Sequence, residues 1–442
     1  MRRIKLHHAI LLAMVLAAAV GLPLNFAAER GLVDPGLVTG VADLGGKVGG
    51  LFLRLLQMLV VPLIVASLVT GVARMGDLRA LGRLGWRTLA YYVGTSALAI
   101  ATGIAWVNVL RPGVGSDLHL LEAGATDVST SVGQHATSVW AVLWQQMESL
   151  IPRNPLAAAA AGDMLPVIFF SLVLGVFLNA AEHAEDGEVD ESGERPVVVV
   201  RRFFVGLFDV MMRVTLWVIS LAPIGVFGLM LLAAAGHGLA AFEALGMYAL
   251  TVACALAMHA LLTLPLVLFL LTRRSPLAFA RVMMPALLTA FSTASSNGTL
   301  PLTMSSAEAG GIHQRTTSFV LPLGATINMD GTALYEAVAV LFIAQVYGLE
   351  LGLGQQIIVA FTALLASVGA AGIPHAGTVM MVVVLSAVGL PTTAVGLILA
   401  VDRILDMCRT AVNVWSDSTA AAVLDRFARA DRPGLAPASA AP

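Results

Sequence analysis

The chain has 442 residues, of which 58% are hydrophobic and 12% charged, and its formal net charge is -2. Soluble proteins are about 45 to 50% apolar and about 25% charged, so this composition predicts a membrane protein. Basic residues lie at the ends of apolar segments and form no stripe mixed with aromatic residues, which excludes a nucleic-acid partner. The two cysteines, Cys254 and Cys408, lie in apolar segments and exclude a disulfide framework or a cysteine-based metal site.

Apolar segments long enough to span a bilayer recur along the chain. We expect eight transmembrane helices, near residues 9–27, 49–74, 88–110, 164–180, 203–235, 244–272, 318–347 and 394–424. If these alternate in direction, the short loops that carry Arg and Lys residues fall on one side, which places both termini in the cytoplasm. The basic start before the first apolar run also fits a signal peptide. However, the run continues through Pro23 as a full span, and the later spans need it to keep their orientation.

Two further regions are apolar enough for the membrane but are interrupted by small residues. The first, residues 286–304, is centred on Ser295–Pro301, and the second, residues 357–390, is centred on Ser367–Pro374. Broken backbone at membrane depth is tolerated only where protein or a water-filled cavity covers it. We therefore expect two re-entrant helical hairpins, which in transporters mark the solute site. The alternative is a proline or glycine kink in an ordinary span.

The last expected span carries five polar residues on one face: Asp402, Asp406, Arg409, Asn413 and Asp417. At about 100° per residue they fall within about 80° of one another. Each ionised group at mid-membrane costs from about 2.5 kcal/mol upward, so the stripe must face partners or water. The alternative is a structural Asp406–Arg409 pair, but five polar residues exceed what one pair requires.

These residue types indicate what the stripe binds. The planar fork of Arg409 matches a carboxylate, and Asp406 suits an ammonium group. Together they favour an amino acid with a second carboxylate. Asn413 and Asp417 supply hard oxygen ligands, which are appropriate to an alkali cation.

The seventh expected span contains a polar break at Gly324–Thr332. Unwinding there exposes carbonyl groups, so Asn328 and Asp330 are candidates for a cation site. That site has no transition-metal character, because no His or Cys lies near it. Glu336, one turn further on, is either a proton carrier or a protonated hydrogen-bond donor.

From about Leu51 to Leu424 the chain resembles the dicarboxylate/amino acid:cation symporter family, which includes the excitatory glutamate transporters and archaeal sodium-aspartate symporters. The motifs that carry this resemblance are Ser295–Pro301, Asn328–Thr332, Ala371–Pro374 and Asp406–Thr410 with Asn413 and Asp417. The resemblance implies an all-α membrane protein with the glutamate-transporter-like elevator fold, assembled as a homotrimer in the cell (inner) membrane. It implies secondary active import of aspartate or glutamate coupled to sodium, with proton or potassium coupling as an open question and no organic cofactor.

The resemblance also divides the chain. Residues 1–87 would hold scaffold spans one and two, 88–110 transport-domain span three, 111–235 an external loop and scaffold spans four and five, 240–428 the transport core, and 429–442 a flexible tail.

Residue by residue, the resemblance implies the following sites. The substrate would contact Ser296, Thr332, Ile373, Gly377, Asp406, Arg409, Thr410 and Asn413. One sodium would be held by Gly324, Asn328, Asn413 and Asp417; a second by backbone around Thr326, Ser367, Val368 and Ala370; a third by Tyr92, Thr95, Ser96, Asn328 and Asp330. Glu336 is similar to the glutamate that animal members carry, where it is associated with proton and potassium coupling.

The chain departs from the family pattern at several positions. Acidic-substrate members carry a second arginine where this chain has Ala294 or Met407, which leaves Arg409 as the only arginine of the stripe. His375 and Ser416 stand where glycine is usual, and Ala370 stands where threonine is common. His375 is read either as a pH sensor or as a solvated loop histidine.

Other function classes remain as alternatives. Within the same family, a C4-dicarboxylate or a neutral amino acid is the alternative substrate. A passive channel is the alternative mechanism. An intramembrane enzyme would need Ser295, Ser296, His259 or His375 as catalytic groups. The sequence contains neither a nucleophile elbow nor an HExxH motif, so we expect no enzymatic activity.

Overall fold

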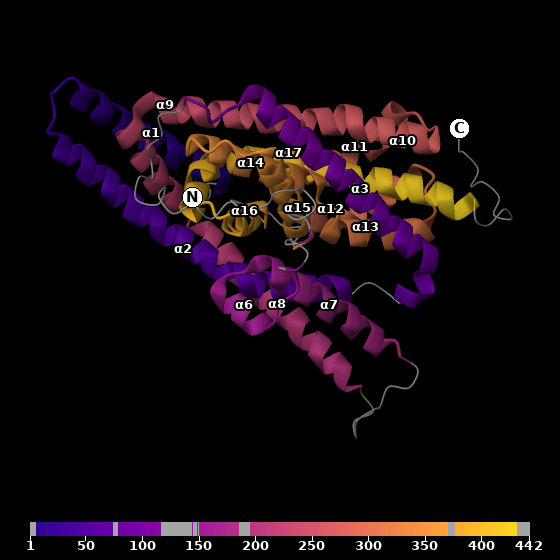
Figure 1. The fold of residues 1–442 in the computed structure, drawn as a ribbon. Coiled ribbons are helices and arrows are strands. Elements are labelled where there is room, and N and C mark those ends of the chain that lie inside the picture. Colours follow the sequence, from indigo (N-terminus) through magenta and orange to yellow (C-terminus); the bar gives the residue numbers. More distant parts are fainter. Residues whose placement is uncertain are drawn as a thin grey trace, which may run out of the picture.

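The computed structural model describes residues 6–73, 78–115, 144, 148, 150–184, 195–369 and 376–430, and the regular structure within them is helical (Figure 1). The helices of the first half are α1 (Leu6–Glu29), α2 (Pro35–Ala73), α3 (Leu78–Leu110), α6 (Pro155–Ala161), α7 (Met164–Glu182), α8 (Pro196–Ser220) and α9 (Ala222–Met258). Those of the second half are the π-helical turn η1 (His259–Thr263), α10 (Leu264–Thr272), α11 (Pro276–Thr293), α12 (Ser296–Ala309), α13 (Gln314–Ile327), α14 (Asp330–Val346), α15 (Leu353–Gly369), α16 (Ala376–Ala387), the 3-10 turn η2 (Thr392–Ala394) and α17 (Val395–Ala430).

The part of the chain that the structure describes contains eight helices long and apolar enough to cross a membrane. Eight is also the predicted number of spans, but the eight helices are not the same as the eight predicted ones. The set includes α11, which we expected to form half of a hairpin, and omits α17, our predicted last span. Charged residues recur along α17 from Asp402 to Arg429, so it does not qualify by composition in spite of its 36 residues.

The predicted fifth span is not one continuous helix. The predicted span 203–235 is divided at Leu221, where α8 ends and α9 begins with a proline in its first turn. Pro223 has no N–H to donate to the preceding turn, which explains the break. The chain then turns at Gly238 (φ 58°, ψ -137°), inside the predicted gap between spans five and six. A side chain at Gly238 would collide with the Asn25 amide, which donates to Ala235 O at 3.0 Å.

The predicted polar breaks are present where the structure describes them. Between α11 and α12, Ala294 adopts a left-handed conformation (φ 51°), and Ser295 caps α12 by accepting a hydrogen bond from Gly298 N at 3.0 Å. The seventh span is interrupted at Asn328 and Met329, which separate α13 from α14. The helices α15 and α16 contact each other, but residues 370–375 between them, including Ala370, Ile373 and His375, lie outside the described residues.

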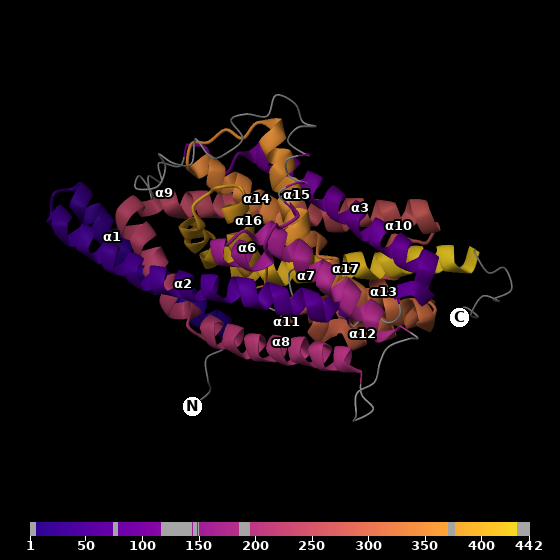
Figure 2. The same cartoon turned by 60° about the horizontal axis from the view of Figure 1, so that its bottom comes forward.

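The core of the molecule is α14, whose residues from Asp330 to Ala344 are all buried. It is surrounded by α3, α9, α15, α16 and α17 (Figure 1). Around this core, α1 and α9 pack together, and α2 contacts α7, α8 and α9. In Figure 2, α8 runs along the outer edge of the bundle, with large apolar side chains such as Phe203 and Trp217 exposed. In a multi-pass membrane protein such a face contacts lipid.

The turn between α12 and α13 is held at one end of the core by charged side chains. Arg274 Nη1 donates to Gly310 O at 2.9 Å, and Arg429 Nη2 donates to Gly311 O at 2.7 Å. Asp425 pairs with Arg429 at 2.8 Å. Partial burial lowers the pKa of the Arg274 guanidinium. These contacts fix the ends of α12 and α13 against α17, which carries the polar stripe.

Candidate solute and cation site

Arg409 lies at the centre of the molecule and is 1% exposed. Its Nη2 lies 2.7 Å from Asp406 Oδ1, and its Nη1 lies 3.5 Å from Asp402 Oδ1. The guanidinium also lies over the Tyr335 ring, with Cζ 4.1 Å from the ring centroid. A buried charge is tolerated only with partners of this kind. Arg409 therefore sits in a set of contacts that an incoming carboxylate could replace.

Asp402 positions Arg409 and joins three helices. Tyr335 on α14 donates a hydrogen bond to Asp402 Oδ1 at 2.8 Å, and Thr378 on α16 donates to Oδ2 at 2.7 Å. With its ion pair to Arg409, the carboxylate links α14, α16 and α17. Asp402 is therefore part of the Arg409 cluster and lies apart from the contacts of Asn413 and Asp417.

The start of α16 approaches Arg409 closely. A Cβ on Gly377 would lie 2.7 Å from Arg409 Cζ, so only glycine fits there beside the guanidinium. Ile373, the other residue expected to cover the substrate, lies outside the described residues. The hydroxyl of Thr410 donates to Asp406 O at 2.8 Å, within its own helix, and Ser296 is buried in the first turn of α12.

Asn413 connects α17 to the break before α14. Its Oδ1 accepts a hydrogen bond from Gly331 N at 2.7 Å, and its Nδ2 donates to Thr332 Oγ1 at 3.2 Å. The interruption at Asn328 and Met329 leaves the first N–H groups of α14 without partners in the preceding turn. Asn413 binds one of them and brings the predicted substrate residue Thr332 to α17.

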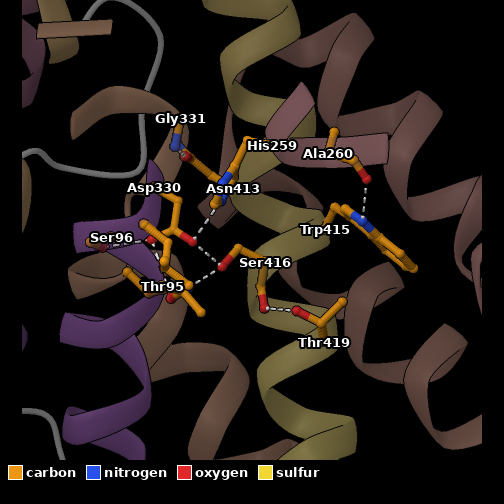
Figure 3. Close-up of polar contacts among 12 residues, drawn as sticks. Thr95, Ser96, His259, Ala260, Asp330, Gly331, Asn413, Trp415, Ser416 and Thr419 are labelled. Carbon is orange, nitrogen blue, oxygen red and sulfur yellow. Dashed lines mark hydrogen bonds and ion pairs between the residues drawn. The ribbon is translucent and has the colours of Figure 1, made fainter. Parts of the chain in front are cut away.

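Asp330, at the start of α14, lies in a dense polar network that includes Ser416, one turn beyond Asn413 on α17 (Figure 3). Asp330 is fully buried, and its Oδ1 accepts hydrogen bonds from Ser96 at 2.6 Å and Thr95 at 3.4 Å. Its Oδ2 accepts from Ser416 at 2.6 Å and lies 3.3 Å from His259 Nε2. Residues from α3, η1, α14 and α17 therefore meet at one carboxylate.

Asn328 joins this network to Asp417. Its Nδ2 donates to Asp417 Oδ1 at 2.9 Å and to Ser416 Oγ at 3.0 Å, while its buried Oδ1 has no hydrogen-bond partner. Gly324 permits the approach, because a Cβ there would lie 2.5 Å from Asp417 Oδ1 and 2.9 Å from the Tyr92 hydroxyl. Carboxylate, amide and hydroxyl oxygens with one unsatisfied acceptor form a donor set that suits a hard cation.

The remaining predicted cation ligands are arranged differently. Thr326 and Ser367 donate their hydroxyls within their own helices, to Pro322 O at 3.2 Å and Leu364 O at 2.9 Å. Their helices, α13 and α15, contact each other, and Val368 packs partly buried against the core. Ala370 lies outside the described residues. The structure therefore brings the helices of this second predicted site together without a direct contact between these two hydroxyls.

Our prediction that no histidine lies near Asp330 was wrong. His259 lies 71 positions earlier in the chain, is fully buried and begins the π-helical turn η1. One feature of the sequence could have identified it, because an ionisable side chain inside an apolar segment is functional by default. The π-helical turn, a conformation that clusters at functional sites, is visible only in the structure. Ser416, noted from the sequence only as a departure, bridges Asn328 and Asp330. Among the described residues, no group of three or more His, Cys, Asp or Glu side chains could hold a metal ion.

A buried cluster around one arginine beside an oxygen-rich network on a broken helix is the arrangement expected of the resembled transporters. The model of the sodium:dicarboxylate symporter family matches residues 6–427. The chain belongs to this family. Excitatory amino acid transporter 4 of Mus musculus is 39% identical over 86% of this chain and 77% of its own length. The proton/glutamate-aspartate symporter of Escherichia coli K12 is 35% identical over 95% of this chain and 92% of its own length.

Glu336 is the one predicted functional carboxylate that lies outside both clusters of this sodium:dicarboxylate symporter family member. It is fully buried in α14, and neither of its carboxylate oxygens has a hydrogen-bond partner. An ionised carboxylate in that position would be strongly destabilised. The surroundings of Glu336 therefore favour the protonated acid.

Proposed function

We propose that the protein is a secondary active transporter that imports aspartate or glutamate together with sodium. The observation that carries this proposal is the fully buried Arg409, whose fork is held by Asp406 and Asp402. Burying a guanidinium at membrane depth costs free energy, so such a group is functional by default, and solute binding is the function proposed for Arg409. The family membership and the names of the relatives from mouse and E. coli support an acidic amino acid.

Substrate binding exchanges partners within the Arg409 cluster. The side-chain carboxylate of the substrate takes the place of Asp406 Oδ1 on Arg409, and the released Asp406 oxygen accepts the substrate ammonium. A C4-dicarboxylate lacking the ammonium would leave Asp406 unpaired in the protein interior. In this proposal Ser296, Thr332, Ile373, Gly377, Thr410 and Asn413 complete the substrate site.

Sodium binds in the network next to the substrate. Asp330, with Tyr92, Thr95, Ser96 and Asn328, forms one proposed site. Asp417, with Gly324, Asn328 and Asn413, forms another, and the unsatisfied Asn328 Oδ1 supports it. Backbone around Thr326, Ser367, Val368 and Ala370 forms the third. Asn413 touches both the substrate half and the cation half of α17, which couples the two binding events.

The proposed movement is that of an elevator. Helix α3 and residues 240–428, including the α11–α12 and α15–α16 re-entrant hairpins, form the transport domain. It slides against a scaffold of α1, α2, α7, α8 and the first half of α9 in a homotrimer with cytoplasmic termini. Gln57 Nε2 on α2 donates to Thr392 Oγ1 in η2 at 2.9 Å, a contact across the proposed boundary that sliding would have to break.

Uptake by purified protein in proteoliposomes tests this function. Labelled aspartate and glutamate are offered while sodium, proton and potassium gradients are imposed separately. We expect accumulation above equilibrium when an inward sodium gradient is present and none for Arg409→Ala. Arg201→Ala, which removes the peripheral ion pair to Glu182, serves as the control that retains uptake. If the wild-type protein accumulates no acidic amino acid under any gradient, the proposal is wrong; downhill flux alone would indicate a channel.

Proton coupling through Glu336 is a second candidate, within the same transport function. Its burial without hydrogen-bond partners favours it, as does the relative named a proton/glutamate-aspartate symporter. In this candidate Glu336 is protonated while the substrate is carried and releases its proton when the site reopens. An imposed proton gradient without sodium would then drive or enhance uptake.

A further inference from the structure

Arg403 contacts the same carboxylate that Arg409 holds, from the other side. Its Nη1 lies 3.5 Å from Asp406 Oδ2, while Arg409 Nη2 lies 2.7 Å from Asp406 Oδ1. Each oxygen of Asp406 therefore faces a different arginine. The Arg403 side chain is 18% exposed and that of Asp406 is 5% exposed, so the contact is largely shielded from solvent.

Arg403 lines a cavity whose lining contains no other charged side chain among the described residues, so Asp406 is the charged partner that Arg403 contacts. Arg403 lines a small cavity with Phe52 and Leu56 of α2, Val226 of α9 and Thr378 of α16. Every other residue of that lining is apolar apart from Thr378. A guanidinium facing such a surface is stabilised mainly by the carboxylate that it reaches.

Arg403 also balances the charge of the cluster. Asp402 and Asp406 contribute two carboxylates, and Arg403 and Arg409 contribute two guanidinium groups, so the four side chains sum to zero. Without Arg403 the cluster would carry an excess negative charge that opposes an anionic substrate.

We propose that Arg403 is a positioning residue for substrate recognition that supplies a second positive charge to Asp406 from one turn earlier on α17. This inference rests on the proposed function. Arg403 keeps Asp406 Oδ2 in place throughout binding. Asp406 Oδ1 is then released from Arg409 in the orientation that accepts the substrate ammonium. Arg403 itself does not touch the substrate.

Three substitutions at this position test the proposal in the proteoliposome assay. Arg403→Ala removes the side chain, Arg403→Gln keeps most of its length without charge, and Arg403→Lys keeps the charge. We expect the KM for aspartate to rise about tenfold in the first two variants, with Vmax changed less than twofold, and to return toward wild type in Arg403→Lys. Arg201→Ala is the matched control, because it removes another partly exposed ion pair and should leave KM unchanged.

Competition with succinate separates ammonium recognition from a general disturbance. Succinate has both carboxylates but no ammonium group, so the loss of Arg403 affects it through charge alone, and the concentration that gives half-inhibition should rise less in Arg403→Ala than the KM for aspartate does. The proposal is overturned if the KM for aspartate stays within twofold of wild type in Arg403→Ala and Arg403→Gln. It is also overturned if the KM for aspartate rises as much in Arg403→Lys as in those two variants. Wild-type uptake of aspartate, measured in parallel, shows separately whether the proposed function holds.

Discussion

His259 and Asp330 form a buried pair between η1 and α14, with Nε2 3.3 Å from Oδ2 and both side chains fully shielded from solvent. His259 Nδ1 has no hydrogen-bond partner. The ring donates to Asp330 Oδ2 only through a proton on Nε2. With that donor in place His259 orients the Asp330 carboxylate.

Removing this donor should weaken sodium binding. In His259→Ala we expect the KM for sodium in aspartate uptake to rise about tenfold. The reason is that Asp330 Oδ2 keeps the Ser416 hydrogen bond but loses the contact with His259 Nε2. His259→Gln, which retains a donor, should show a smaller rise. Trp415→Phe is the control, since it removes the 3.1 Å hydrogen bond to Ala260 O in the same turn without touching Asp330. An unchanged or lower KM for sodium in His259→Ala would contradict this role.

Gly324→Ala should damage the cation site through a steric effect. The added Cβ would lie 2.5 Å from Asp417 Oδ1 and must push the carboxylate away from Asn328. We expect sodium-dependent uptake to fall at least about tenfold at subsaturating sodium. Gly246→Ala on α9, where a Cβ meets nothing within 4 Å, should behave as wild type. Equal activity of the two variants would show that Asp417 is not needed at this position.

Glu336→Gln tests proton coupling. The amide copies the shape of the protonated acid but cannot release a proton, so we expect aspartate uptake to lose its pH dependence between about pH 5 and 8. Sodium-driven uptake or exchange should persist in this variant. Glu308→Gln is the control, because Glu308 is exposed and accepts a hydrogen bond from Thr317 at 2.8 Å. A pH profile identical to that of the wild-type protein would exclude Glu336 as the proton carrier.

Two substitutions of Tyr335 separate its hydrogen bond from its ring. Tyr335→Phe loses the 2.8 Å hydrogen bond to Asp402 and should raise the KM for aspartate about fivefold, which corresponds to about 1 kcal/mol. Tyr335→Ala also removes the ring beneath Arg409, and a desolvated cation–π contact contributes about 2 kcal/mol or more, so uptake should be nearly lost. Tyr347→Phe, whose hydroxyl has no hydrogen-bond partner, should leave KM unchanged. Equal KM values for Tyr335→Phe and wild type would show that this hydrogen bond does not hold Asp402.

The sequence alone was sufficient for features that depend on local periodicity and composition. The stripe from Asp402 to Asp417 follows from spacings of three and four residues on one helix. The breaks at Ser295 and Asn328 follow from small and polar residues inside apolar segments. Arg403 lies only three residues from Asp406 and was overlooked because it flanks the stripe, although a long arginine side chain can reach across to it.

The tertiary structure alone decided which further polar groups join these sites. The resemblance had already grouped Ser96 with Asp330, but nothing in the sequence placed His259 there from 71 positions earlier, and no helical period relates a separation of that size. The assignment of Asp402 to the Arg409 cluster depended on Tyr335 and Thr378, which reach it from two other helices. Periodicity predicts which face of a helix is polar. Only the packing of the helices determines what that face binds, because buried charges take the partners that neighbouring helices bring within hydrogen-bonding distance.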